Sequence, residues 1–306
     1  MRTAEAGSGT DPSTIAAFLV MVVAVGGNVI GIKYIARAGE LDPLWAAASR
    51  FLLAAAIFAI AARAMRAPLP RGRAFVGAVL YGTLSIGAFF GLAYWGLQRA
   101  PAGLAGVFLA TGPLLTFLFA LAHRQEQFSW DSMIGAIIVV AGTAIVYNAG
   151  RDEGVPAASL LAILAASACA AEGAIVVKGF PPVHPAMRNT IGMAVGAAFL
   201  LVLMPFFDES VSIPNTATTW AAQVYLVLIG SVAVFALYLF ILSRWTASSA
   251  SYEFVLAPIV GVVLAVWLLD EQVSGRFIAG SVVVLAGVYL GAIRPARAKH
   301  PRRAGE

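Results

Sequence analysis

Long apolar runs alternate along the chain with short segments that carry Pro, Gly or charged residues. A helix that crosses a bilayer needs about 20 mainly apolar residues. The pattern therefore predicts ten membrane-spanning helices, at 14–34, 44–63, 74–97, 102–122, 132–149, 157–177, 185–205, 220–242, 247–269 and 276–293. The longest connection, residues 206–219, is too short to form a domain of its own.

The composition indicates a chain that lipid surrounds. Hydrophobic residues make up 60% of the 306 residues and charged residues only 11%, whereas a soluble domain carries roughly 25% charged residues. We therefore expect an all-α integral membrane protein. The single Cys169 lies in an apolar run, which excludes a disulfide framework and a cysteine metal site. We expect no metal and no cofactor.

The basic residues predict the orientation. Residues 1–13 are expected to be a cytoplasmic tail and not a secretory signal, because the apolar run that follows is longer than the roughly 7–15 residues of a signal core. With the N-terminus inside, fourteen Lys and Arg residues fall on the cytoplasmic side, five fall on the other side, and Arg50 lies within a span. This bias fits the positive-inside rule and places both termini in the cytoplasm. It also explains the net charge of +5 without nucleic acid as a partner.

The two halves of the chain carry the same pattern without a gap. Pro113 and Pro258 stand 145 positions apart, as do Lys33 and Lys178. Further pairs at the same offset are Glu126/Glu271, Gln127/Gln272, Ser129/Ser274, Gly135/Gly280, Ala141/Ala286 and Gly142/Gly287. The series indicates a duplicated five-span unit, at 14–149 and 157–293, followed by a basic cytoplasmic tail at 294–306.

An odd number of spans makes the second unit enter the membrane from the opposite side. The sequence thus predicts ten transmembrane helices as two inverted five-helix repeats. Inverted repeats build many secondary transporters, in which the substrate site lies near the midplane at the interface between the repeats. We therefore expect a transport function.

Nearly the whole chain resembles the EamA family of the drug/metabolite transporter superfamily. The resemblance rests on VAVGGNVIGIKYI, on Pro43 and Arg50 in LDPLWAAASRFLLAAA, and on AYWGLQRAPAGLAGVFLATGPLLTFLFALAHRQEQ, which SASYEFVLAPIVGVVLAVWLLDEQ matches in the second half. Gly26-Gly27 stands where this family commonly has Trp-Gly, and Gln127 where a basic residue often follows the glutamate. The resemblance implies export of amino acids, other metabolites or drugs across a bacterial inner membrane, without specifying a ligand.

Two acidic residues are predicted inside spans, where a charge is costly unless it is paired, hydrated or facing a cavity. Glu253 is a candidate for binding a proton or a substrate amine; the alternative is an acid in a hydrated cytoplasmic mouth. Glu172 is a candidate for lining the cavity opposite the first span; the alternative is a boundary acid that is paired locally. Two acids facing the cavity would favour cationic or zwitterionic solutes.

Two further polar residues have competing interpretations. Asn28 stands beside Gly27 and Gly31, a spacing that lets another helix approach closely. Its amide is expected either to contact the substrate or to bond a neighbouring helix. Arg50 is expected to anchor the second span through carbonyl groups or an acid; the alternative is direct binding of a substrate carboxylate.

Aromatic residues are candidates for lining the cavity. Tyr81, Trp95 and Tyr252 are the substrate-binding candidates, although Trp95 near a span end also fits the interfacial aromatic belt. Pro113 and Pro258 each remove a backbone hydrogen bond in a predicted helix. We expect them to act as matched bending points during gating; the alternative is a fixed kink for packing.

The leading hypothesis is a secondary transporter that exports amino acids or related small metabolites by alternating access. Drugs or other toxic compounds are the alternative cargo, and a non-transporting scaffold is a third hypothesis. No GxxxxGK[ST] motif is present, so a proton or solute gradient is the expected energy source. The expected partners are a small-molecule substrate, the bilayer and protons, in a monomer or a homodimer. We expect no enzyme, because His123, His184 and His300 form no cluster at membrane depth.

Overall fold

The computed structural model describes residues 12–124, 128, 130–152, 154–242, 244, 253–270 and 274–290. All regular elements in these ranges are helices, and none of the described residues forms a β-strand. Seven helical segments are long and apolar enough to cross a membrane. Three more apolar stretches are shorter, at Met133–Gly142, Ile259–Leu269 and Gly275–Gly287. The prediction of an all-helical membrane protein is confirmed, and the count of ten spans stays a prediction.

The helices lie close to the predicted spans. The first half contains α1 (Pro12–Ala38), α2 (Pro43–Ala64), α3 (Arg73–Tyr81), η1 (Gly82–Ala88), α4 (Phe89–Leu97), α5 (Ala102–Leu109), α6 (Gly112–Ala122) and α7 (Trp130–Asp152). The second half contains α8 (Ala157–Lys178), α9 (Pro185–Leu203), η2 (Met204–Phe207), α10 (Ala217–Val227), η3 (Leu228–Ala233), α11 (Val234–Leu242), α13 (Glu253–Leu269) and α14 (Gly275–Val288). Pro43 and Pro185 open α2 and α9, where the missing N–H has no helical partner to lose.

Two of the long helices are interrupted by π-helical turns. η1 lies between α3 and α4, and η3 lies between α10 and α11. The two segments end at Ala88 and Ala233, which are separated by the 145-residue offset of the sequence repeat. Turns of this kind occur frequently at functional sites. The apolar pattern of the sequence predicts no such interruption.

The expected mid-helix bend at Pro113 takes a different form. α5 ends at Leu109 and α6 begins at Gly112, so the helix is broken at Ala110 and Thr111. Pro113 therefore lies in the first turn of α6, where it needs no backbone donor. Pro258 lies within α13, as the sequence predicted.

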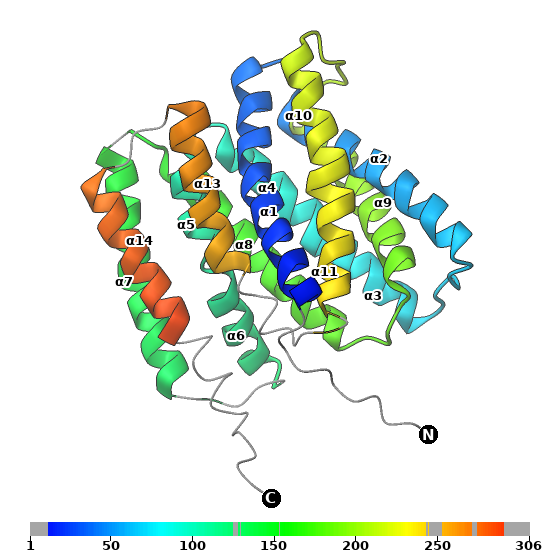
Figure 1. Ribbon diagram of the computed structural model, residues 1–306, viewed down its shortest axis with the longest axis horizontal. Helices are drawn as coiled ribbons and strands as arrows, with labels where there is room; N and C mark the ends of the chain where they lie inside the picture. Colours follow the sequence, from blue (N-terminus) through cyan, green and yellow to red (C-terminus); the bar gives the residue numbers. More distant parts are fainter. Residues whose placement is uncertain are drawn as a thin grey trace, which may run out of the picture.

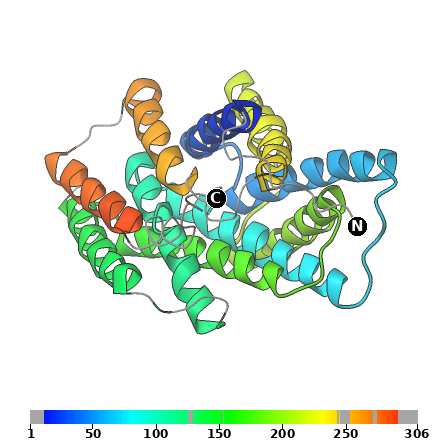
Figure 2. The same ribbon diagram turned by 60° about the horizontal axis from the view of Figure 1, so that its bottom comes forward.

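The helices pack as two layers between two paired edges (Figures 1 and 2). α7 and α14 lie side by side at one edge, and α2 and α9 pair at the other. Between them, α1, α13 and the α10–α11 helix form one layer, and α4, α5 and α8 form the other. The start of α1 and the end of α14 lie at one end of the bundle (Figure 1), which we call the terminal end. The opposite end, with residues 39–42 and 208–216, is the distal end.

Three charged side chains are buried among the described residues: Lys33, Arg50 and Glu253. Charged groups are rare inside membrane-spanning segments because their burial is costly. Each of the three therefore marks a position where a specific interaction is needed.

Candidate functional site

Arg50 is completely buried where α2 meets η3 and α4. Its Nε donates to Ser231 Oγ at 2.7 Å, and its Nη2 donates to the Gly230 carbonyl at 2.8 Å. Its Nη1 donates to Tyr94 Oη at 3.4 Å. Arg50 therefore bonds hydroxyl and carbonyl groups, and no carboxylate among the described residues pairs with it. We call Asn28, Arg50, Tyr94, Gly230 and Ser231 the central cluster.

Asn28 brings α1 to the same backbone group. Its Nδ2 donates to the Gly230 carbonyl at 3.2 Å, so this oxygen accepts from both Asn28 and Arg50. The carbonyl oxygen Oδ1 of Asn28 is buried and has no hydrogen-bond partner among the described residues. It lies so close to Gly230 that any side chain at position 230 would collide with it. Only a glycine lets the three helical segments meet here.

The glycines beside Asn28 provide the close helix approach that their spacing predicted. A side chain at Gly27 would collide with Tyr225 Oη, and one at Gly31 would meet Leu226, both on α10. Tyr225 Oη donates to the Ala24 carbonyl at 3.0 Å and fastens the contact. This face of α1 is therefore the face that packs against the second half of the chain.

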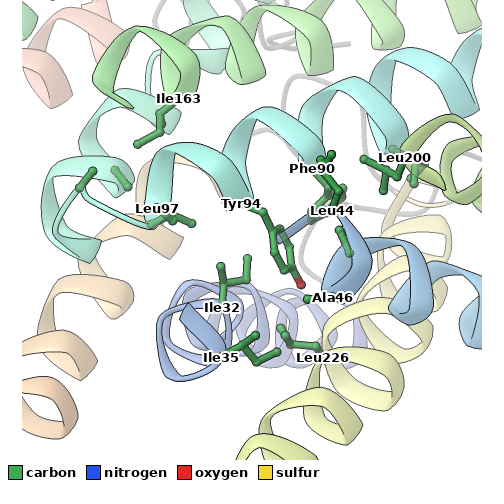
Figure 3. Close-up of a cluster of buried hydrophobic side chains, with 14 of the residues drawn as sticks. Ile32, Ile35, Leu44, Ala46, Phe90, Tyr94, Leu97, Ile163, Leu200 and Leu226 are labelled. Atoms are coloured by element: carbon green, nitrogen blue, oxygen red, sulfur yellow. The ribbon is translucent and has the colours of Figure 1, made fainter. Parts of the chain in front are cut away.

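The structure brings Tyr94 to the central cluster and not its neighbour Trp95. Tyr94 is only 2% exposed, and it extends from α4 into the interior with its hydroxyl toward α2 (Figure 3). Trp95, in contrast, is 37% exposed. Consecutive residues on a helix face different directions, so the side chains of Tyr94 and Trp95 have different surroundings.

Lys33, Tyr34 and Arg37 hydrogen-bond the distal end of α1 to neighbouring helices. Lys33 Nζ donates to the carbonyls of Leu97 and Ala100 beyond α4, at 3.2 and 2.8 Å. Tyr34 Oη and Arg37 Nη2 donate to carbonyls at the end of α13, each at 3.1 Å. The last carbonyls of a helix lack helical partners and favour a nearby cation. Lys178, the repeat counterpart of Lys33, is exposed at the end of α8.

Acidic side chains join the two distal connections. Glu209 Oε2 accepts from the backbone amides of Leu44 and Trp45, at 2.8 and 3.2 Å, in the first turn of α2. Burial raises the pKa of the Glu209 carboxyl above its ordinary value, although these two hydrogen bonds oppose the shift. Asp42 Oδ2 accepts from the amide of Ser210 at 2.8 Å.

Glu40, in the connection between α1 and α2, makes the reciprocal contact with the connection between α9 and α10. Its Oε2 accepts from the amides of Asn215 and Thr216 at 2.7 and 3.1 Å. Burial pushes the pKa of Glu40 up, but the hydrogen bonds from Thr216 and Asn215 outweigh it and hold this pKa below its ordinary value. The connection between α1 and α2 is thus tied to the connection between α9 and α10.

Glu253 is buried at the start of α13, with 8% of its surface exposed. Tyr238 of α11 lies within electrostatic range of Glu253, Tyr81 and Arg188. The ring of Tyr81 packs against Gly192 of α9, where a Cβ would lie 2.6 Å from Tyr81 Cδ1. The structure therefore brings the candidates Glu253 and Tyr81 into one region, around Tyr238. Tyr252 lies outside the described residues.

Glu172 has a local partner. Its Oε1 lies 2.9 Å from Nε2 of His123, which follows α6, and the two side chains are 29% and 46% exposed. Of the two interpretations of Glu172, this geometry corresponds to the locally paired acid. Sequence spacing could not find this pair, because His123 and Glu172 are 49 positions apart and belong to different helices.

The chain shares sequence with known transporters over most of its length. A probable terminal-alkyne amino-acid exporter of Streptantibioticus cattleyicolor is 28% identical over 79% of this chain and 81% of its own. A probable amino-acid metabolite efflux pump of Salmonella typhimurium is 26% identical, with 89% and 92% of the two chains covered. The inner membrane transporter YedA of Escherichia coli, itself uncharacterized, is 28% identical over 83% and 85%.

A crystal structure with 17% sequence identity shares the fold, with a TM-score of 0.66 over 95% of this chain and 100% of that chain. The model of the EamA-like transporter family matches twice, at residues 12–148 and 157–292. These two matches take in almost all of the described helices, so the chain belongs to the EamA-like transporter family.

Proposed function

We propose that this protein is a secondary transporter of the inner membrane that exports amino acids or related small metabolites by alternating access. Its relatives bear the names of an amino-acid exporter and an amino-acid metabolite efflux pump. The central cluster is the observation that carries the proposal. It joins Asn28, Arg50 and Tyr94 of the first family match to Gly230 and Ser231 of the second, at the kind of interface where transporters bind substrate.

The helix contacts support an arrangement of ten spans in two inverted repeats. α1 packs against α13, and its counterpart α8 packs against α6. α1 also packs against the α10–α11 helix with η3, as α8 packs against η1 and α4. α2–α9 and α7–α14 are pairs of counterparts. Each of these contacts thus has an equivalent with the halves exchanged, as a two-fold relation would produce. In the proposed orientation the terminal end faces the cytoplasm.

Export is tested with the purified full-length protein in liposomes loaded with unlabelled amino acids. Counterflow of labelled amino acids, taken one at a time across the common set, should exceed that of protein-free liposomes for at least one of them. Folded protein that moves none of them would refute the amino-acid proposal.

Protons are the proposed coupling ion, with Glu253 and Glu172 as the candidate binding groups. Glu253 is buried, and Glu172 lies 2.9 Å from His123, which makes the two acids the candidates for this role. An imposed pH difference should drive transport in liposomes, and Glu253→Gln or Glu172→Gln should abolish that response. Asp208→Asn, at an exposed acid in the distal connection, is the matched control. A flux that ignores the pH difference would leave facilitated transport and remove proton coupling.

A further inference from the structure

No acid among the described residues balances the charge of Arg50. A guanidinium stays protonated in proteins, and an unpaired buried charge is unfavourable. Among the described residues, its contacts are neutral hydroxyl and carbonyl groups and the rings of Phe51 and Phe90, whose centroids lie 5.0 and 4.9 Å from its Cζ. The rings stabilise a cation only partly. The position therefore favours an anion that the described chain does not supply.

Arg50 also has hydrogen-bonding capacity left over. A guanidinium group has five N–H donors, and three of them are used, one each on Nε, Nη1 and Nη2. One N–H on each Nη nitrogen remains, and a carboxylate accepts two parallel N–H bonds in a bidentate pair.

The central cluster contains a second group with unused hydrogen-bonding capacity, and this group needs a donor instead of an acceptor. Asn28 Oδ1 is a buried acceptor that receives no hydrogen bond from the described part of the chain, and it belongs to the side chain that shares the Gly230 carbonyl with Arg50. An ammonium group next to a bound carboxylate would supply that donor. A cation with free donors beside a free acceptor is complementary to a solute that carries both charges.

We propose that Arg50 binds the carboxylate of the transported solute and that Asn28 Oδ1 accepts from its ammonium group, which makes this protein selective for carboxylate-bearing, zwitterionic solutes. The assignment rests on the proposed transport function and names the chemical class of its substrate. Arg50 is closed off from solvent in this structure, so the solute enters only when the helices around the central cluster part.

A purely structural anchor makes a different prediction. If Arg50 only fastened α2 to η3, its loss would impair transport of every solute alike and would leave any preference for a carboxylate unchanged. Recognition by Arg50 instead requires the wild-type protein itself to distinguish a carboxylate from its uncharged analogue. The first measurement therefore uses the wild-type protein, and Arg50→Gln then tests whether its preference comes from this residue.

The experiment uses each amino acid that the counterflow assay finds to be transported. Its unlabelled carboxamide and its decarboxylated amine are tested as competitors of the labelled amino acid, against the unlabelled amino acid itself. We expect both analogues to compete at least about tenfold more weakly, as loss of a bidentate charged pair implies. Arg50→Lys should keep transport with weaker apparent affinity for the amino acid, because a lysine ammonium keeps the charge but cannot bind a carboxylate through two parallel N–H bonds. Arg50→Gln should remove the preference, and Arg63→Gln, at an exposed arginine of α2, should not.

The outcomes separate the two proposals. If the carboxamide or the amine competes as well as the amino acid, the assignment to Arg50 is overturned while the transport function stands. If a folded protein moves no amino acid, the transport proposal fails, and the substrate class falls with it. If the analogues compete weakly but Arg50→Gln keeps the preference, another residue recognises the carboxylate and the assignment is overturned.

Discussion

Gly142 in α7 lies directly against Val284 in α14, so closely that a Cβ at position 142 would come within 2.7 Å of the amide nitrogen of Val284. The same contact recurs with the halves exchanged. A Cβ at Gly287 would lie 2.8 Å from the amide nitrogen of Val139. Gly142 and Gly287, like Val139 and Val284, are separated by the 145-residue offset. Reciprocal contacts of this kind arise when a two-fold axis relates two surfaces.

Replacing either glycine by leucine should therefore destabilise the protein to a similar degree. The obstacle at each site is backbone, which cannot rotate away as a side chain can, so we expect a loss of about 1–3 kcal/mol or more. Thermal unfolding in detergent measures it for Gly142→Leu and Gly287→Leu. Ala144→Leu, at an exposed position of α7, should have little effect. Widely different losses for the two glycines would argue against the two-fold relation.

Ser231 supports Arg50 through a single hydroxyl. Ser231→Ala leaves the Nε donor of a buried guanidinium without its 2.7 Å partner, and hydrogen bonds to charged groups contribute about 1.5–3 kcal/mol. The unfolding free energy should fall by that amount. Ser281→Ala is the control, because its hydroxyl bonds only the carbonyl of Phe277 one turn earlier in its own helix. An equal effect of both substitutions would show that Arg50 does not depend on Ser231.

The distal acids should give opposite pH dependences. The folded protein holds the proton of Glu209 more tightly than the unfolded chain, so this group's contribution to stability is full in acid and is lost as pH rises from about 4.5 through the raised pKa. Glu209→Gln removes the titration and keeps an acceptor oxygen. Unfolding temperatures are measured between acid and neutral pH. The unfolding temperature of the variant should rise relative to that of the wild type as the pH rises.

Glu40 provides the comparison of opposite sign. Its pKa is lowered on folding, so its contribution is present above the ordinary value of 4.5 and is lost as pH falls through the lowered pKa. The unfolding temperature of Glu40→Gln should lie below that of the wild type at neutral pH and should equal it in strong acid. Parallel curves for wild type and both variants would contradict the assigned contacts.

Lys33 should control access from the distal side. Lys33→Met deletes two charge-assisted bonds to carbonyls, each worth about 1.5–3 kcal/mol, and about 1.4 kcal/mol already corresponds to a tenfold change in an equilibrium. A cysteine at Ala100, in a Cys169→Ser background, should react faster with an impermeant maleimide applied to intact cells. Lys178→Met should leave that rate unchanged, since Lys178 is exposed. Unaltered labelling in Lys33→Met would mean that the distal end opens without breaking these bonds.

The apolar runs predicted where the helices lie because lipid imposes one requirement on every span. They could not predict η1 and η3, since the π-helical turns depend on contacts that form only after packing. The Gly230 carbonyl is the clearest case. It is a backbone group at a residue without a side chain, and it becomes a shared acceptor only because Asn28 and Arg50 converge on it.

Residue type was sufficient to single out Asn28, Arg50 and Glu253, since polar groups inside apolar runs are conspicuous. It could not choose between Tyr94 and Trp95, which are both aromatic and adjacent, because the helix rotation that buries one of them is set by neighbouring helices. The sequence distinguishes Lys33 only as one member of a repeat pair. It bonds carbonyls at the end of α4 and just after it, which are 64 and 67 positions away in the sequence.

The hydrogen bonds at the distal end of α1 bear on how well such a carrier keeps exported solute outside the cell. In the proposed orientation this end faces outward. Lys33, Tyr34 and Arg37 of α1 donate hydrogen bonds there to carbonyls at the ends of α4 and α13. The apparent affinity for an external solute is lowered by the fraction of molecules open to that side. Net flux still follows the gradients. Dilute solute outside the cell, however, rarely meets an open site. Few transport cycles therefore carry exported solute back into the cell.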